Sequence, residues 1–328
     1  MEVTEAMQET KTKRELISVC GPISPKELGF CQSHEHLALS KGRSWELNPD
    51  LCIDDTDKSI LEACLYREAG GSAILEAQPG GCNRMTEELV RISEKSKVHI
   101  LASTGFHKLC FYYGDHWIFS RSQDELADFF IRELTEGMFT DADTIFAGKQ
   151  IRAKAGFVKT ALDSCNLTPD YRRLFLAAAD AAIFAGRSVM IHVEKNSDPL
   201  KLLDLLTRSG IAPTRLIFCH TDRACSNLDI PLKLLRAGAF LELDTIGRFK
   251  YHDDLTEASI FQNLVEKGYE DQLLFSLDTT RARLRSYTPN AVGLDYLLLV
   301  FLEQLRGFGI TSEQISKFSH ENVLRALL

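Results

Sequence analysis

The sequence has no excess of basic residues. Among its 328 residues, 46 are acidic and 38 are basic, which gives a formal net charge of -8. Proteins that bind nucleic acid or anionic lipid typically present a broad basic surface. We therefore expect neither nucleic acid nor a membrane as a partner.

Long apolar segments are also lacking. The N-terminus, MEVTEAMQETKTKREL, is charged throughout and contains no apolar core of a secretory signal. No apolar run in the sequence reaches the length that a bilayer-spanning helix needs. The expected location is the cytoplasm.

The cysteines show no disulfide or zinc-binding pattern. The chain has nine cysteines, and no two of them form a CxxC pair. Cys31 and Cys219 lie inside strand-like apolar runs. We interpret the cysteines as reduced, mostly buried thiols.

No Pro/Gly/Ser-rich linker or low-complexity segment divides the chain. Its length and its 45% hydrophobic content suit one large α/β barrel or two ordinary domains. Without a linker, we expect a single domain over residues 1–328, with a polar N-terminal arm at about residues 1–20.

Eight short apolar runs recur along the chain. Each is nearly continuously apolar rather than alternating, which is typical of parallel strands covered on both faces. The runs are residues 28–34, 72–77, 98–104, 155–160, 188–193, 215–220, 239–244 and 273–278.

Amphipathic segments separate the runs, as at residues 57–71, 124–137, 168–186 and 198–210. They begin near Asp or Thr-Pro and end at Gly, as helices do. Eight such units predict a (β/α)8 TIM barrel. A doubly wound open sheet is the competing fold, but no Gly-rich phosphate loop follows the first run. The clearest insertion is residues 105–150.

Polar residues stand at the ends of several predicted strands. In GFCQSHEHL, two histidines at positions i and i+2 project from the same face of a strand. The carboxyl ends of all barrel strands face one mouth, where we expect such side chains to meet. The converging set is His34, His36, Lys159, His192, His220 and Asp278.

These residue types suit a metal site. Four imidazoles and one carboxylate exceed what one tetrahedral ion takes while keeping an open position, so two ions fit better. An ammonium at Lys159 would be repelled by them. Apolar neighbours and nearby cations favour a neutral amine, which can react with CO₂ to form a bridging carbamate. A pair of ions so held activates water and polarises a carbonyl or phosphoryl oxygen.

Each residue alone has a simpler interpretation. A histidine in an apolar strand is usually a hydrogen-bonded core residue, and a lysine at a strand end usually extends to the rim. Asp278, followed by two threonines, is also typical of a helix cap. Their joint placement at the same end of successive strands favours the metal site.

The order HxH, Lys, His, His, Asp resembles the phosphotriesterase-like branch of the amidohydrolase superfamily. The segments LELDTIGRFKY, LFSLDTTR and GLDYLLLVFLEQLRGFGI are similar to its phosphotriesterase-related (homology-protein) subgroup. The resemblance implies a buried ion on His34, His36 and Asp278, an exposed ion on His192 and His220, and carboxylated Lys159 as the bridge. Some members of the subgroup carry Glu at the bridging position. By the same resemblance, the expected assembly is a homodimer.

The expected activity is that of a metal-dependent hydrolase acting on a small molecule. Zn²⁺ is the first choice of metal, with Mn²⁺ or Co²⁺ as alternatives, and Asp278 is the expected proton acceptor. A lactone or carboxylic ester is the preferred substrate, since metal-activated water attacks it without strong protonation of a leaving amine. A phosphotriester or N-acyl amide is the alternative. Mononuclear deaminases and non-catalytic metal-binding barrels represent other classes.

Substrate contacts are expected from the loops. Arg281 lies beyond the eighth run, and Lys250 and Tyr251 lie beyond the seventh, so two cationic loops could bind a phosphate or carboxylate. A solvated rim paired with nearby acids is the alternative. Gln78 and His107 are expected to face the substrate. Further candidates for substrate contact or proton relay are Glu76, Arg84, Arg248, His116 and His252, although most of these histidines are expected at the surface.

Overall fold

All eight apolar runs are strands of one parallel, nearly closed barrel. The computed structural model describes residues 15–223 and 227–328. Neighbours along the chain pair in parallel from β3 to β10, which confirms the predicted TIM barrel. The barrel strands are β3 (Cys31–Glu35), β4 (Ala73–Glu76), β5 (His99–Gly105), β6 (Phe157–Leu162), β7 (Val189–Val193), β8 (Leu216–Cys219), β9 (Phe240–Leu243) and β10 (Leu273–Phe275).

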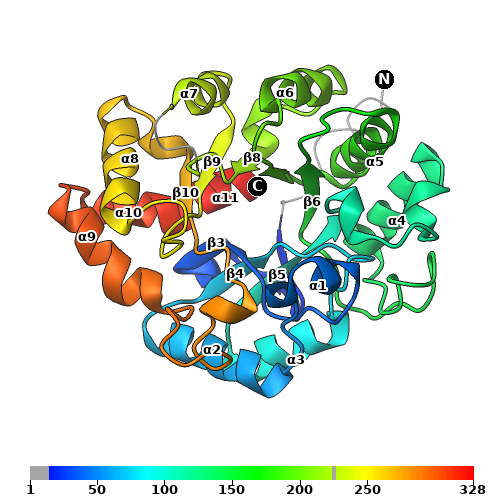
Figure 1. Ribbon diagram of the computed structural model, residues 1–328, viewed down its shortest axis with the longest axis horizontal. Coiled ribbons are helices and arrows are strands. Elements are labelled where there is room, and N and C mark those ends of the chain that lie inside the picture. Colours follow the sequence, from blue (N-terminus) through cyan, green and yellow to red (C-terminus); the bar gives the residue numbers. More distant parts are fainter. Residues whose placement is uncertain (1–14, 224–226) are drawn as a thin grey trace, which may run out of the picture.

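Helices surround this barrel (Figure 1). The four amphipathic segments named from the sequence form α2, α4, α5 and α6, and a side chain of Asp, Ser or Thr caps the N-terminus of each. The helices are α1 (Arg43–Leu47), α2 (Thr56–Glu68), α3 (Thr86–Ser96), α4 (Gln123–Thr135), α5 (Pro169–Ala185), α6 (Pro199–Arg208), α7 (Asp229–Arg236), α8 (Asp254–Glu266), α9 (Leu302–Gly307), α10 (Ser312–Ser316) and α11 (Asn322–Leu327).

A small hairpin and the last helix pack against the barrel interior. The hairpin consists of β1 (Leu16–Ser18) and β2 (Gly21–Ile23), and its apolar residues share one buried cluster with those of α11 and the strands. The last residues of the expected polar arm therefore lie in a packed hairpin, where Leu16 and Val19 are buried. Residues 1–14 of that arm lie outside the described part of the chain.

Side chains join the first and last strands of the barrel. The hydroxyl of Ser276 accepts a hydrogen bond from the His34 backbone N–H at 3.0 Å and lies 2.8 Å from the His34 carbonyl oxygen. The backbone N–H of Asp278 donates to that same carbonyl at 3.2 Å. The eighth strand is shorter than its apolar run, since β10 ends at Phe275 and Asp278 adopts a positive φ of 49°.

Two further expectations concern cysteines and membranes. None of the eight described cysteines forms a disulfide. Four of them are buried, so the expectation of mostly buried thiols holds for only half; Cys20, Cys110 and Cys165 are exposed. Within the described residues, every helix is too short or too polar to span a bilayer.

Candidate metal centre

The two histidines of the HEH motif meet Asp278 across the junction of the first and last strands. The Nε2 atoms of His34 and His36 lie 3.7 and 3.4 Å from Oδ1 of Asp278. All three side chains are buried. Potential ligand atoms of these residues all lie within 4.8 Å of one another. The structure thus brings together the three residues expected around the more buried ion.

Lys159 points into the same group from β6. Its side chain is fully buried, and its Nζ lies 3.2 Å from Nε2 of His34. The backbone around it depends on Gly105 of the neighbouring strand, which has a φ of 113°. A Cβ at Gly105 would collide with the Lys159 carbonyl oxygen, which accepts the Phe106 N–H at 2.9 Å. Glycine therefore permits the close approach of the two strands.

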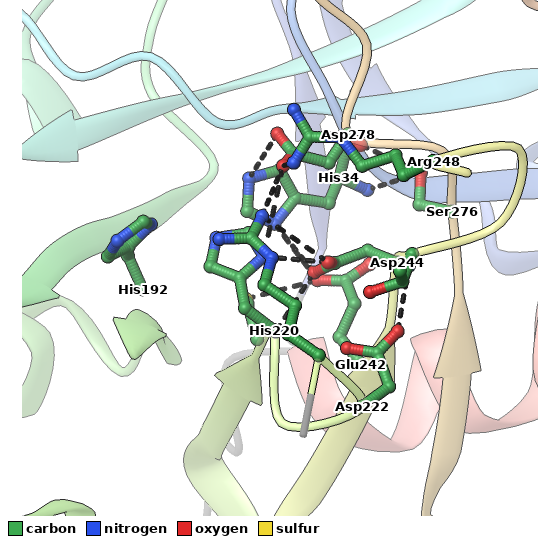
Figure 2. Close-up of polar contacts among 12 residues, drawn as sticks. His34, His192, His220, Asp222, Glu242, Asp244, Arg248, Ser276 and Asp278 are labelled. Atoms are coloured by element: carbon green, nitrogen blue, oxygen red, sulfur yellow. Dashed lines mark hydrogen bonds and ion pairs between the residues drawn. The ribbon is translucent and has the colours of Figure 1, made fainter. Parts of the chain in front are cut away.

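His220 lies between His34 and His192 (Figure 2). Its ring centroid is 5.0 Å from that of His34 and 4.4 Å from that of His192. His192 has a different partner from the other histidines, since its Nε2 lies 3.4 Å from Oε2 of Glu194. Among the described residues, His192 belongs to none of the three compact groups of potential ligand atoms.

Burial keeps most of these imidazoles neutral. It lowers the pKa of His34 well below the usual value, with a further effect from Lys159. Burial followed by Arg223 lowers the pKa of His220, and burial lowers that of His192 to about 4. Burial also acts on His36, but hydrogen bonding to carboxylates raises its pKa to about 9. An ion bound by His36 would displace the proton of this ring.

Asp278 is held by two arginines. Its Oδ2 accepts hydrogen bonds from Arg248 Nη1 at 2.5 Å and from Arg223 Nη2 at 2.7 Å. Burial opposes ionisation, but Arg248 and the neighbouring histidines hold the pKa of Asp278 well below its usual range. Oδ1 is left facing the histidines. Sequence reasoning missed Arg223, although it follows His220 by only three residues.

Two buried carboxylates lie beside the histidines and were also missed: Glu242 in β9 and Asp244 directly after it. Asp244 accepts the backbone N–H of His220 at 3.1 Å, and its Oδ1 lies 2.7 Å from Nδ1 of that ring. Glu242 accepts a hydrogen bond from Cys219 Sγ at 3.2 Å. Burial raises the pKa of Glu242 to about 7 and that of Asp244 well above its usual value. The sequence signal was two acids inside the apolar run AFLELD.

A cavity next to His36 contains two of the expected substrate contacts. Gln78 and His107 line it, together with Phe111 and Thr280. The His107 ring lies 5.3 Å from that of His192. Burial, with a smaller effect from His192, lowers the pKa of His107 well below its usual value. Through this cavity a substrate could approach His36 and His107.

The cationic loops are largely engaged within the protein. Arg281 donates to Asp54 at 3.0 Å and stands outside the residues that line the cavity at His36. Exposed Lys250 lies over the Tyr251 ring, with Nζ 4.9 Å from its centroid. The guanidinium of Arg223 also lies over the Tyr251 ring, with Cζ 5.1 Å from the ring centroid. Tyr251 is thus linked to Asp278 through Arg223, whereas Arg281 forms a paired rim.

Four further candidates have other contacts. Fully buried Glu76 faces His36, and Arg84 forms a buried ion pair with Glu133 at 2.6 Å. The expectation that most of His107, His116 and His252 are at the surface is wrong, because His107 is buried and the other two are partly buried. Nε2 of His252 lies 2.5 Å from Oε2 of the buried Glu257. Nδ1 of His116 accepts the backbone N–H of Ile118 at 3.1 Å and so caps a short helical turn.

Comparison with known proteins agrees with this architecture. The sequence profile of the Phosphotriesterase family matches residues 14–327. The Phosphotriesterase homology protein of Escherichia coli is 27% identical, over 90% of this chain and 96% of that protein. A Phospho-furanose lactonase of Mycoplasmopsis synoviae is 27% identical, over 94% of this chain and 90% of that protein. The crystal structure of an amidohydrolase from Mycoplasma synoviae aligns with a TM-score of 0.91 at 25% identity, covering 96% of this chain and 92% of that chain. The chain therefore belongs to the phosphotriesterase family of metal-dependent hydrolases.

Proposed function

We propose that this chain opens a lactone, or cleaves a carboxylic ester, of a small anionic molecule. Two divalent ions, most simply Zn²⁺ with Mn²⁺ or Co²⁺ as alternatives, would be bridged by a carbamate on Lys159. The observation that carries the proposal is the placement of Lys159, fully buried with Nζ 3.2 Å from His34 Nε2. An isolated lysine in such a place would be costly, and a carbamate would make it an anionic ligand.

The side chains present fit such ions. Neutral imidazoles and a carboxylate are suitable ligands for Zn²⁺. His34, His36 and Asp278 would hold one ion, and His192 and His220 would hold the other. The Nδ1 atoms of His34 and His36 are buried without a hydrogen-bond partner among the described residues, so these rings have unused ligand capacity.

The protein supplies an ionised proton acceptor at this centre. When bound, the ions would provide Lewis acidity and promote ionisation of water. Asp278, kept ionised by Arg248 and Arg223, would accept a proton at Oδ1 and pass it toward solvent or the leaving group. Because a lactone leaves as an alcohol, no strongly basic amine has to be protonated. This chemistry favours the lactone or ester over an amide.

Charge near the mouth supports an anionic substrate. Arg223 contacts Asp278 and lies over the ring of Tyr251, and exposed Lys250 lies over the same ring, so that a phosphate or carboxylate approaching this loop would meet positive charge. A similar family member carries the name phospho-furanose lactonase. We therefore expect phosphorylated sugar lactones to be better substrates than their uncharged counterparts.

Metal analysis combined with a substrate panel tests this function. The panel should pair phosphorylated with unphosphorylated sugar lactones and include carboxylic esters, N-acyl amides and a phosphotriester. We expect metal-dependent turnover that is fastest with the phosphorylated lactones. Two bound ions without turnover of any member would instead indicate a non-catalytic metal-binding barrel.

A further inference from the structure

Asp278 lies in a backbone conformation that few residues with a side chain adopt. Its φ of 49° is in the left-handed region. This region favours glycine, and other residues stay there only where the surrounding structure holds them. The backbone N–H of Asp278 donates to the His34 carbonyl at 3.2 Å. That contact leaves the carbonyl side of the turn, at Leu277 and Asp278, to be held by another group.

The guanidinium of Arg283 binds that side of the turn. Its Nη1 donates to the carbonyl oxygens of Leu277 and Asp278, the latter at 3.1 Å. Its Nη2 donates to the carbonyl oxygen of Ile246 at 2.6 Å, in the loop that follows β9. This second loop carries Arg248, whose Nη1 donates to Oδ2 of Asp278 at 2.5 Å (Figure 2). One side chain therefore joins the loop of Asp278 to the loop of its arginine partner.

Arg283 has a different kind of partner from the other arginines of its loop. Arg281 pairs with Asp54, and Arg285 pairs with Asp295. Within the described part of the chain, the Arg283 guanidinium donates only to carbonyl oxygens. Burial lowers its pKa to about 10, so the group is still charged at neutral pH. Its planar fork of donors can reach carbonyls on two separate turns, which the single nitrogen of a lysine cannot do in the same way.

Arg283 is itself held from both sides. Its backbone N–H donates to the Thr280 carbonyl at 2.8 Å, and its own carbonyl accepts the N–H of Gly293 at 2.9 Å. In the other loop, Gly247 has a φ of 65°, and a Cβ there would lie 3.2 Å from Nη2 of Arg283. Glycine at this position therefore leaves room for the guanidinium beside the Ile246 carbonyl.

We propose that Arg283 is a positioning residue, which clamps the turns after β9 and β10 and so fixes Asp278 and Arg248 relative to each other. Its contacts are with the backbone, so it acts on the Asp278 carboxylate through the turn that carries it. Release of the clamp lets Oδ1 move relative to the histidines that it faces at 3.7 and 3.4 Å. The inference rests on the proposed function for the role of Asp278 as proton acceptor, whereas the clamp itself is a property of the fold.

Amide hydrogen exchange of the metal-free protein tests the clamp without any need for turnover. We expect Arg283→Ala to lose protection in peptides covering residues 245–249 and 276–280, and to keep it in β7. Arg283→Lys should lose part of this protection, and it provides the test if the alanine variant does not fold. The control is Arg285→Ala on the same loop, which should exchange like the wild type. Unchanged protection of the two loops in every Arg283 variant that folds would overturn the inference.

Turnover of a phosphorylated sugar lactone by the zinc-loaded protein gives a second readout. Arg283→Ala should lower kcat about 100-fold, because a small displacement of a catalytic group has an effect of this size. KM should change little, since Arg283 does not contact the substrate, and added methylguanidinium should restore part of kcat. A raised KM with unchanged kcat would overturn the positioning role. A wild type that hydrolyses no lactone or ester would refute the proposed function alone, because hydrogen exchange would still decide whether the clamp exists.

Discussion

Glu35 accepts hydrogen bonds from both the backbone N–H and the hydroxyl of Thr279, at 3.0 and 2.6 Å. Its other oxygen accepts the N–H of Leu277 at 2.8 Å and lies 2.7 Å from the Ser276 hydroxyl. Glu35 is fully buried between the two histidines of the HEH motif. One carboxylate therefore ties β3 to the segment that carries Asp278.

Replacing Glu35 should disturb both stability and metal binding. In Glu35→Gln, the amide would place an N–H₂ group against donors, leaving buried donors unsatisfied at a cost of about 2–3 kcal/mol. We expect the free energy of unfolding in urea to fall by that amount, with a loss of bound metal. Exposed Glu94→Gln is the matched control and should behave as the wild type. A Glu35→Gln protein of normal stability and metal content would contradict this role.

Lys250 and Arg281 should differ in their effect on an anionic substrate. Arg281 is paired with Asp54, whereas Lys250 is exposed over the ring of Tyr251, which Arg223 also contacts. We expect Lys250→Ala to raise KM for a phosphorylated lactone about 10-fold and to spare the unphosphorylated lactone. Arg281→Ala should change KM for either lactone by less than about 10-fold. Equal losses for both lactones in the Lys250 variant would argue against recognition of the anion there.

His116 should make stability depend on pH. Burial lowers its pKa to about 4, below the value of about 6.5 expected in the unfolded chain. The folded state excludes the proton, so stability is fully present above pH ~6.5 and is lost as the pH falls toward about 4. His116→Asn keeps an acceptor for the Ile118 N–H but does not titrate. Urea unfolding of metal-free protein at neutral and mildly acidic pH should therefore show a smaller loss for the variant; an equal loss would exclude His116 as a source.

The barrel was predictable because its strands are buried on both faces. Continuous apolar runs such as residues 188–193 have few other interpretations, and the helices between them carry clear caps. The limits of the last strand were less predictable. Ser276 and Asp278 leave the ladder because they contact β3, which lies more than 240 residues away in sequence.

The convergence of the histidines, Lys159 and Asp278 followed from their position at strand ends. The carboxylates beside the histidines could not be predicted in this way, because the sequence around an acid such as Glu242 does not show which ring it faces. Only the contact between β9 and β3 shows that partner. Arg281 was instead predicted to bind a substrate anion because of its charge. In the structure it pairs with Asp54, and the sequence does not show that the two loops meet.

The central claim is that Lys159 bridges two metal ions as a carbamate. The most direct measurement is the metal content of wild type and Lys159→Ala, combined with ¹³C NMR after exchange with labelled bicarbonate. We predict two ions per chain and a carbamate signal in the wild type. Both the signal and the full metal content should be lost in Lys159→Ala, with partial recovery of metal in Lys159→Glu. A Lys159→Ala protein that retains two ions and hydrolyses lactones at the wild-type rate would contradict the account.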